Sequence, residues 1–443
     1  MLLNPLNRRV REQQGMPVMA GAFPVLGHLP AVMSSLTDLL RYAEQRHGTH
    51  FWLEMGTFGR MLVCTQPEAF ALFKNKHVLT DLLGEVAPPL KDTMATQDGD
   101  SHRSTRAWAN PAFQPQGLTG AKVGDLFADI MLARIGQWPV SAPIRLVDEV
   151  SDMSLTMIFR MLGVDEQAIA EWTRFYSDYF LVSAWPVDLP GTRFRRSRHA
   201  QTWIDANLQT LIDDARARPD AGGLLAMLVH SIVSSNVALT DASLLANLRA
   251  LIHAAHKTTA VTMAQLVIKI AQHPEYWALL CAEAKSIGEV PRNPANLVSF
   301  PYAEALFRET LRYHPAFPLA LRRTEEAIDL GGRSIEAGTR FIIPLVLLSR
   351  NAELYPQPDV FMPGRWMGRN EGLKPIDTMQ FGNGPHRCLG YHTAWMQLVQ
   401  FAVALALTLS ARGVRPRLVS SDAGRHRFFP LTYPPRTTRI AFE

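Results

Sequence analysis

One short segment, "FGNGPHRCLG" at residues 381–390, combines reactive side chains with a backbone that can bend sharply. It places Cys388 among three glycines, directly after a histidine and an arginine. The residues that follow, "LGYHTAWMQLVQFAVALAL", predict a helix, so Cys388 lies at a helix N-terminus, where free N–H groups favour a thiolate. The glycines allow positive φ angles and let a flat ligand approach the backbone. On these grounds the cysteine could be a nucleophile, a metal ligand or an inert core residue.

Two common uses of such a loop do not match this sequence. No second cysteine stands at the C-x-x-C spacing of a zinc site. The segment does not fit G-x-G-x-x-G either, because its third glycine is too distant and no βαβ unit surrounds it. The other two cysteines, Cys64 and Cys281, are interpreted as small buried hydrophobic residues. Three sparse cysteines in 443 residues indicate a reducing compartment and no disulfide framework.

The longest predicted helix begins near Thr240–Asp241, where threonine offers an N-cap and aspartate lies at the positive end of the helix dipole. It runs to His273–Pro274, where proline stops it. At this length it spans roughly 45–50 Å, the width of a whole domain. It contains no glycine or proline and is apolar on most sides, which is typical of a helix through a core.

The middle of this helix, "LIHAAHKTTA", has two different faces at about 100° per residue. The inward-facing residues are apolar or carry a hydroxyl group: Leu244, Leu248, Leu251, Ala254, Ala255, Thr258, Thr259 and Thr262. Three titratable residues fall on the other side: His253, His256 and Lys257. Small residues leave room for a ligand against the backbone, and a buried threonine can donate to the carbonyl four residues earlier. Taken alone, the pattern favours ordinary close packing.

The pattern F-x-x-G-x-H-x-C-x-G, carried by Phe381, Gly384, His386, Cys388 and Gly390, resembles the haem-binding loop of the cytochrome P450 superfamily. The resemblance implies haem b (iron protoporphyrin IX) as cofactor and the Cys388 thiolate as the iron ligand. Thiolate pushes electron density onto iron and favours O–O cleavage. Backbone N–H groups after the cysteine would tune the sulfur. The family resemblance also implies that five further residues contact the haem: Phe381, Gly382, Gly390, Ala254 and Ala255.

Other motifs of that family follow in the expected order. "ETLR" supplies E-x-x-R through Glu309 and Arg312, one helical turn apart. In isolation these two would be interpreted as a surface ion pair. "YPQPDVFMPGRW" resembles the family's proline-rich segment and supplies Arg365. The resemblance implies that Glu309, Arg312 and Arg365 form a buried structural triad beside the haem.

The resemblance also implies cations for the two haem propionates. His102 and Arg106, four residues apart, resemble the family's H-x-x-x-R helix, and Arg322 and His386 are the other two candidates. Guanidinium groups suit carboxylates because they bind them bidentately. Arg323 adjoins Arg322, so the sequence leaves this register open by one residue.

One departure from the family concerns the central helix, where the usual A-G-x-[D/E]-T-T reads Ala254, Ala255, His256, Lys257, Thr258, Thr259. The resemblance implies a catalytic role for Thr258, with Thr259 beside it, at the oxygen-binding side of the haem. Lysine in place of the acid reverses a charge there. Either Lys257 reaches an acid in the covering helices, for which Asp178 and Asp188 are candidates, or its ammonium replaces the carboxylate as proton source.

The expected substrate is lipophilic, because the residues expected around it are apolar. These pocket residues are Leu251, Ala254, Ala255, Phe317, Leu319, Ala320, Phe428 and Phe429. The resemblance therefore implies a monooxygenase that hydroxylates or epoxidises a terpenoid, polyketide or similar natural product with O2. "WPVDLPGTRF" (185–194) faintly resembles members that act on terpenoids, retinoids or sterols. The alternatives are a peroxide-using, isomerising or dehydrating haem-thiolate enzyme, suggested by Lys257, and a haem sensor or carrier without turnover.

Composition limits the possible partners and locations. The net charge is +5, but the basic clusters at 193–198 and 412–417 are short, and no zinc-finger spacing or basic stripe indicates nucleic acid. The N-terminus has no apolar stretch of signal-peptide or anchor type. We expect a cytoplasmic monomer without a membrane anchor. Electrons should come from a separate ferredoxin or flavodoxin with its reductase.

The expected fold is mostly α with a small β region, as in the cytochrome P450 fold. The whole chain, 1–443, is expected to form one domain, since no repeat or linker divides it. Strands are predicted at 50–65, around the turn Gly56–Gly59, at 325–345 and at the C-terminus. Helices are predicted over about 101–313 and 388–410, with the long central helix lying over the haem.

Overall fold

The structure of the chain is a computed structural model that describes residues 2–7, 10–179, 188–218, 222–234, 239–368, 374–419 and 431–443. Its helices are α1 Leu29–His47, α2 Leu82–Val86, α3 Gly99–Phe113, α4 Pro115–Gly120, α5 Val123–Gly136, α6 Leu146–Met161, α7 Ile169–Tyr179, α8 Arg193–Ala217, α9 Leu224–Ser234, α10 Asp241–Gln272, α11 Pro274–Ile287, α12 Pro301–Tyr313, α13 Leu345–Leu348 and α14 Tyr391–Ala411. Its strands are β1 Arg11–Gln13, β2 Met16–Val18, β3 His50–Glu54, β4 Arg60–Cys64, β5 Val78–Leu79, β6 Ile144–Arg145, β7 Ala320–Thr324, β8 Ile328–Leu330, β9 Arg333–Ile335, β10 Arg340–Ile343, β11 Pro416–Leu418 and β12 Arg439–Phe442.

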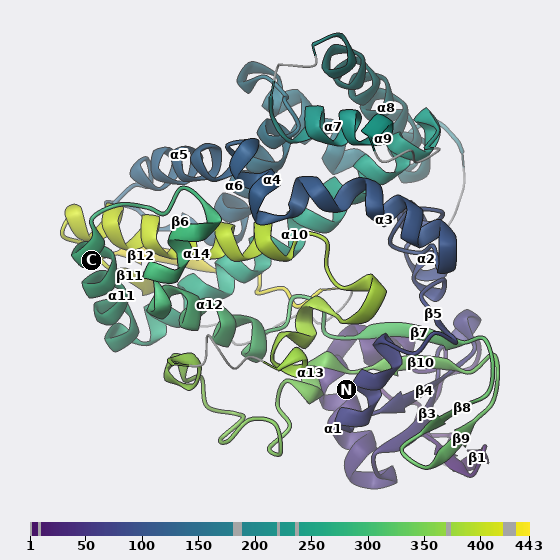
Figure 1. Cartoon of the computed structure of the whole chain (residues 1–443). Helices are drawn as coiled ribbons and strands as arrows, with labels where there is room; N and C mark the ends of the chain where they lie inside the picture. The colour runs from purple at the N-terminus through teal and green to yellow at the C-terminus, as the bar shows by residue number, and fades with distance from the viewer. Residues whose placement is uncertain are drawn as a thin grey trace.

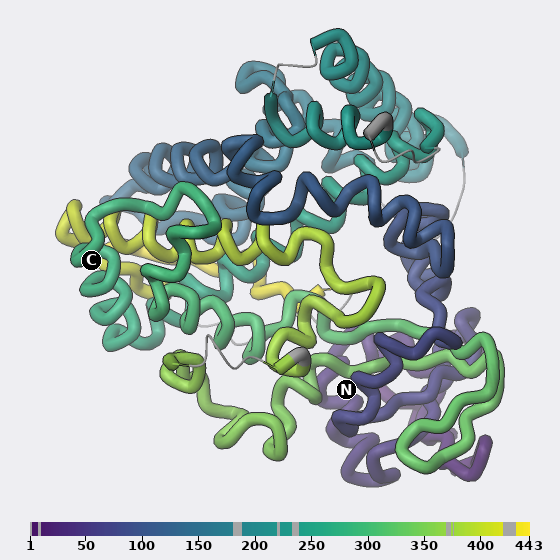
Figure 2. The backbone as a smooth tube through the Cα atoms, viewed as in Figure 1, coloured from purple at the N-terminus to yellow at the C-terminus, as the bar shows by residue number. Residues whose placement is uncertain are grey.

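The helices and the main sheet occupy different parts of the molecule (Figure 1). The main sheet has seven strands in the order β1-β2-β3-β4-β10-β7-β5 and lies beside α1. Two smaller sheets are formed by β11-β12-β6 and by β8-β9. The prediction of a mostly α fold with a small β region is confirmed. Figure 2 shows the N-terminal segment next to the main sheet and the C-terminus on the far side of the helical part.

The main sheet joins strands from distant parts of the chain. β3 and β4 pair antiparallel around the predicted turn, and β4 then pairs parallel with β10. Apolar clusters cover both faces of this sheet: Trp52 and Leu62 pack on one side, Phe51 and Val63 on the other. Because neither face meets water, both sets of alternating side chains are apolar. This explains why the strand alternation in the sequence is imperfect.

The central helix α10 has the predicted ends. The hydroxyl oxygen of Thr240 accepts a hydrogen bond from the Ser243 N–H at 3.2 Å, which satisfies one free donor of the first turn. At the other end His273 caps the helix and Pro274 begins α11. In Figure 1 α10 crosses the middle of the helical part, and it packs on α6, α12 and α14.

α14, which follows the cysteine loop, is a core helix. Within the described residues it is the one helix long and apolar enough to cross a membrane, judged by length and composition alone. Its apolar window is 67% buried inside the fold, against α5, α11 and α12. Its apolar surface is therefore used in packing the protein, with the cysteine loop fixed at its first turn.

Several elements lie outside the predicted ranges. α1 precedes the predicted strands, and β1, β2, β5 and β6 are strands of two or three residues. Strands this short show no periodicity in the sequence, and they form because a neighbouring strand offers hydrogen bonds, as β3 does for β2 through Val18 and Trp52.

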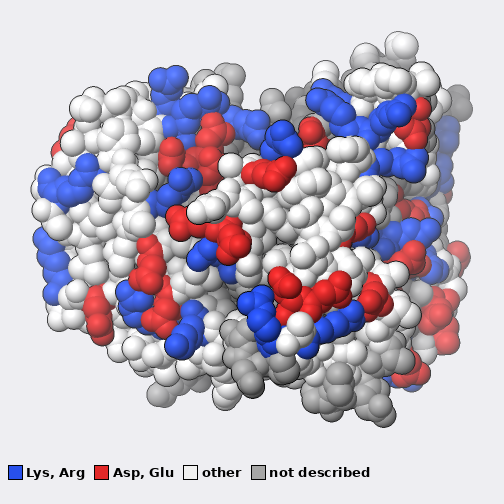
Figure 3. All heavy atoms as spheres, turned by 90° about the horizontal axis from the view of Figure 1, so that it is seen from above, with Lys and Arg blue, Asp and Glu red and all other residues white. Residues whose placement is uncertain are grey.

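The surface carries charges of both signs. On the face shown in Figure 3, lysine and arginine side chains lie interspersed with aspartate and glutamate. Over the described residues as a whole many such charges are paired, such as Arg292 with Asp125 and Asp129, or Arg216 with Asp241. Exposed pairs of this kind contribute little to stability. The face in Figure 3 has no single dominant sign of charge.

Candidate haem-thiolate site

Two short 3-10 segments, Pro375–Phe381 and Gly384–His386, lead into Cys388. The Cys388 N–H donates to the carbonyl oxygen of Phe381 at 2.8 Å, and Gly390 forms the N-cap of α14. Gly384 has a φ of 64°, and a Cβ there would lie 2.3 Å from the Phe73 carbonyl oxygen. Only glycine therefore lets this loop pack against the 3-10 helix η2 (Pro67–Phe73).

The side chain of Cys388 is exposed, although protein atoms surround it closely enough for burial to dominate its pKa. Burial raises the pKa of the thiol, whereas a hydrogen bond from the Gly390 backbone and the charges of Arg106 and Arg387 lower it. The sequence predicted that the helix N-terminus would favour the thiolate. That effect is present, but desolvation outweighs it. A bound cation would reverse this balance, because metal ions deprotonate the thiols that coordinate them.

The first pair of predicted cations lies on α3. His102 is 2% exposed, and its ring stacks on His386 with 3.9 Å between the ring centroids. Burial, followed by the charges of His386 and Arg106, lowers the pKa of His102 to about 4. His102 Nε2 has no hydrogen-bond partner among the described residues. Arg106 donates from Nε to Asn110 Oδ1 at 2.8 Å, and its charge reaches the Cys388 sulfur.

His386 is already paired within the protein. Its Nε2 lies 3.0 Å from Asp98 Oδ1, and the Asp98 carboxylate also accepts from the backbone N–H of Thr80 at 2.8 Å. Although burial of Asp98 opposes it, hydrogen bonding from His386 and Thr80 brings the pKa of Asp98 below its usual value. Asp98 and Thr80 were missed in the sequence, because nothing in the chain indicates that they contact a histidine 288 and 306 residues away.

The structure resolves the register of Arg322 and Arg323. Arg322 is 9% exposed, with its guanidinium 4.5 Å from the centroid of the Phe73 ring, and burial lowers its pKa to about 10. Arg323 points to the opposite face of β7 and pairs with Asp81. Successive residues of a strand alternate between faces, so only Arg322 can point inward.

These groups fit the haem that the sequence implies. The sulfur is a suitable soft ligand for iron, and two arginines and a buried histidine with a free nitrogen suit two carboxylates. One face of α10 is accessible too: Ala254 is exposed, and Leu251, Ala255 and Thr258 are half-buried. The neighbouring Leu248 and Ile252 are fully buried. An apolar planar ligand with polar edges matches this environment.

The threonines of α10 bind backbone and side-chain acceptors. Thr258 donates to the Ala254 carbonyl oxygen and Thr262 to that of Thr258, each at 2.8 Å. Thr259 reaches Gln397 Oε1 of α14 at 3.5 Å. The bonds of Thr258 and Thr262 to carbonyls four residues earlier are those that the sequence predicted, and α10 is continuous from Asp241 to Gln272.

Lys257 lies on the other face and contacts α6. Its Nζ donates to Ser151 Oγ at 3.0 Å, and the same oxygen lies 2.9 Å from His256 Nε2. The proposed partners Asp178 and Asp188 were wrong: Asp188 pairs with Arg198. Burial, with the charge of Arg436, lowers the pKa of Lys257 to about 8, and nearby acids of α6 act in the opposite direction.

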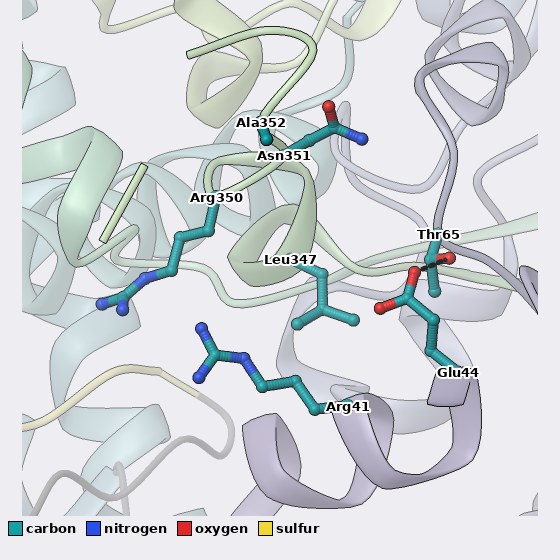
Figure 4. Close-up of a pocket in the computed structure, with 7 residues that line it drawn as sticks. All are labelled: Arg41, Glu44, Thr65, Leu347, Arg350, Asn351 and Ala352. Atoms are coloured by element: carbon teal, nitrogen blue, oxygen red, sulfur yellow. Dashed lines mark hydrogen bonds between the residues drawn. The ribbon is translucent and has the colours of Figure 1, made fainter. Parts of the chain in front are cut away.

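The remaining pocket residues are mostly accessible. Phe317 is 43% exposed, and Leu319 and Ala320 are half-buried. Phe428 and Phe429 lie outside the described residues. A pocket of about 230 Å³ lies elsewhere, between α1 and the turn after α13 (Figure 4). Its arginines, Arg41 and Arg350, both donate to Asp359 Oδ1 at 3.1 Å, so the two guanidinium groups share one carboxylate.

Glu309, Arg312 and Arg365 meet in the core. Arg312 forms two parallel hydrogen bonds with the Glu309 carboxylate, each 2.8 Å, and Arg365 Nε adds a third at 3.1 Å. Both Glu309 and Arg312 side chains are fully buried. The Glu309 carboxylate accepts two further hydrogen bonds, from Trp366 Nε1 at 2.9 Å and from the Met362 N–H at 2.7 Å. The other guanidinium N–H groups donate to backbone carbonyls of residues 349–360.

Comparison with known proteins points to one protein family. A family model described as cytochrome P450 matches residues 17–411. A relative described as "Cytochrome P450 BJ-4 homolog", from Sinorhizobium fredii, is 46% identical over 100% of this chain and 99% of its own length. "Cyclooctat-9-en-7-ol 5-monooxygenase" from Streptomyces melanosporofaciens is 27% identical, covering 89% of each chain. The structure of retinoic acid-bound cyanobacterial CYP120A1 has the same fold, with a TM-score of 0.80 at 21% identity over 95% of this chain and 97% of that one.

The Glu309 contacts generate a stability prediction. Glu309→Ala leaves two buried guanidinium groups without their carboxylate, which we expect to cost ~3–5 kcal/mol of unfolding free energy. Little haem-loaded protein should then be recovered. Chemical denaturation and haem content check this, with Asp100→Ala as control, because Asp100 pairs with Arg103 on the surface. Normal stability and haem content in Glu309→Ala would show that the triad is not structural.

Proposed function

Because the chain belongs to the cytochrome P450 family, we propose that it is a monooxygenase that hydroxylates or epoxidises a lipophilic small molecule. The observation that carries this proposal is the exposed Cys388 sulfur, on which the charges of Arg106 and Arg387 act. On α10, Ala254 is exposed and Ala255 and Thr258 are half-buried. A bound haem-thiolate supplies the activation of O2. The residues of this chain then have to hold the cofactor, exclude water and move protons.

We assign the cofactor contacts as follows. Cys388 ligates the iron, and Phe381, Gly382, Gly390, Ala254 and Ala255 contact the porphyrin. His102, Arg106 and Arg322 bind the propionates. His386 contributes beside them, and its bond to Asp98 also holds the ring on which His102 stacks. His102 therefore acts as a positioned donor in its neutral form, which its low pKa favours at neutral pH.

Proton supply in this protein differs from the family pattern because Lys257 replaces the acid. We assign the hydrogen-bonding role to Thr258, whose hydroxyl must exchange its bond to the Ala254 carbonyl oxygen for a bond to a ligand. Thr259 holds α10 on α14 beside it. Lys257, with a pKa of about 8, is largely protonated at neutral pH but can release its proton. Ser151 links its Nζ to His256.

The substrate is assigned to the terpenoid, polyketide or similar natural-product class. The accessible side chains of the pocket are apolar, and an apolar pocket selects a lipophilic ligand. One relative is named for monooxygenation of cyclooctat-9-en-7-ol. The protein is proposed to be a cytoplasmic monomer that receives electrons from a separate ferredoxin or flavodoxin and its reductase.

The function is tested by reconstitution. Terpenoid and polyketide libraries are titrated against the haem spectrum, and compounds that shift the spin state are incubated with O2, NADPH, ferredoxin and reductase. We expect an oxygenated product that requires every component. Product from peroxide but not from O2 would favour the peroxide-driven alternative. Spectral binding without any product would favour a haem sensor or carrier.

Ligation by Cys388 is tested spectroscopically. The reduced carbon monoxide complex of the wild type should show the red-shifted Soret band of thiolate ligation. Cys388→Ala should lose this band because no other sulfur replaces it, whereas Cys281→Ser should keep it, because Cys281 is buried in α11. A red-shifted band in Cys388→Ala would disprove the ligand assignment.

The roles of Thr258 and Lys257 are tested by coupling, the product formed per electron consumed. Thr258→Ala should lower coupling about tenfold or more, since general acid–base groups typically contribute 10²–10⁴-fold. Lys257→Met should lower it less and remove a dependence on pH near 8, the pKa of Lys257. Lys91→Met, on the surface, is the control. Equal coupling in all four proteins would exclude both residues from proton delivery.

A further inference from the structure

A second cluster of potential metal ligands lies in the main sheet, apart from the cysteine loop. His50 at the start of β3 pairs directly with Cys64 at the end of β4. Glu68, in the 3-10 helix η2, lies against both. His50 and Cys64 are buried and Glu68 is half-buried, and one nitrogen, one sulfur and one carboxylate oxygen lie within 4.8 Å of one another. In the described part of the chain this is the one group of this kind.

His50 and Glu68 face each other without forming a hydrogen bond. His50 Nε2 lies 3.4 Å from Glu68 Oε1, and this buried nitrogen has no hydrogen-bond partner among the described residues. His50 is only 7% exposed, and burial lowers its pKa, so the ring is neutral at neutral pH. Two ligand atoms at zinc-ligand distances in tetrahedral geometry are about 3.4 Å apart. A cation between the two atoms would satisfy both.

The surroundings support the ring and the carboxylate. His50 Nδ1 lies 3.0 Å from the Thr49 hydroxyl, which can accept its N–H and leave the Nε2 lone pair free. Histidines that bind metals usually donate their second N–H in this way. Gly331 lies against the carboxylate, since a Cβ there would be 2.8 Å from Glu68 Oε1. Glu68, 37% exposed, provides a route from solvent.

Of the three ligands, Cys64 must change most on metal binding, because its thiol is protonated. It is fully buried, and burial raises the pKa of its thiol to about 12. A metal must displace this proton, so binding must weaken as the pH falls. The three ligand atoms lie within 4.8 Å of one another, and ideal sulfur–nitrogen spacing at zinc is about 3.6 Å, so the cluster must tighten by at most about 1 Å to bind the ion. The positive charge of Arg333 lowers the pKa of Cys64, but it also repels a bound cation.

We propose that His50, Cys64 and Glu68 form a zinc site, with water as the fourth ligand. A thiolate with an imidazole favours zinc over magnesium or calcium, which prefer oxygen ligands. The bound ion would link β3 and β4 to η2. η2 ends at Phe73, which contacts Arg322 and abuts Gly384 of the cysteine loop. Zinc at one end of η2 therefore stabilises the support of the haem loop at the other.

The test uses haem-loaded protein that has been dialysed against a chelator. Titration with Zn²⁺ at neutral pH should give one bound zinc per chain by elemental analysis and a raised melting temperature, both weaker at about pH 6. Mg²⁺ should have no such effect. Glu68→Gln and Cys64→Ser should each weaken zinc binding at least about tenfold. Cys281→Ser should bind like the wild type, because Cys281 lies in α11.

Two results would overturn the proposal. One is wild-type protein without stoichiometric zinc, which would leave only a His50–Glu68 contact. The other is unchanged zinc binding in both Glu68→Gln and Cys64→Ser. Glu68→Gln alters a half-exposed side chain, so it remains informative if the buried Cys64 variant does not fold. Haem spectra before each titration show that Cys388 remains ligated and does not bind the zinc itself.

Discussion

The buried carboxylate of Glu309 is the constraint on which the haem side of the fold depends. A charge removed from water is stable only when every oxygen lone pair is satisfied, and Glu309 achieves this with two arginines, one indole and one backbone N–H. The same arginines donate to the carbonyls of residues 349–360. α12 is thereby fixed to a segment with little regular secondary structure, which leads into the cysteine loop.

The cysteine loop is held from a second direction by η2. The Phe73 carbonyl occupies the space that a side chain at Gly384 would need. The guanidinium group of Arg322 lies over the Phe73 ring. The short helix η2 therefore contacts both the cysteine loop and Arg322, one of the predicted propionate-binding residues. The His50, Cys64 and Glu68 cluster at its other end gives this segment a further role, because a bound ion would restrict the same contacts.

α10 separates two environments across one helix. Its accessible face carries Ala254 and Thr258, while Lys257 and His256 meet Ser151 of α6 on the buried side. The exchange of an acid for Lys257 is tolerated because a serine hydroxyl accepts its N–H and two acids lie nearby. An amine rather than a carboxylate therefore stands next to Thr258 in the chain.

The sequence alone determined those features that depend on residues close together in the chain. The ends of α10 follow from Thr240 and Pro274, and the contact of Glu309 with Arg312 follows from one helical turn. The family resemblance supplied Cys388 and the cation candidates. Only the tertiary structure decided that His386 meets Asp98, that Lys257 meets Ser151, that Arg322 rather than Arg323 points inward, and that Cys64 faces His50. These contacts join distant residues, and their spacing in the chain carries no information about which strands and helices become neighbours.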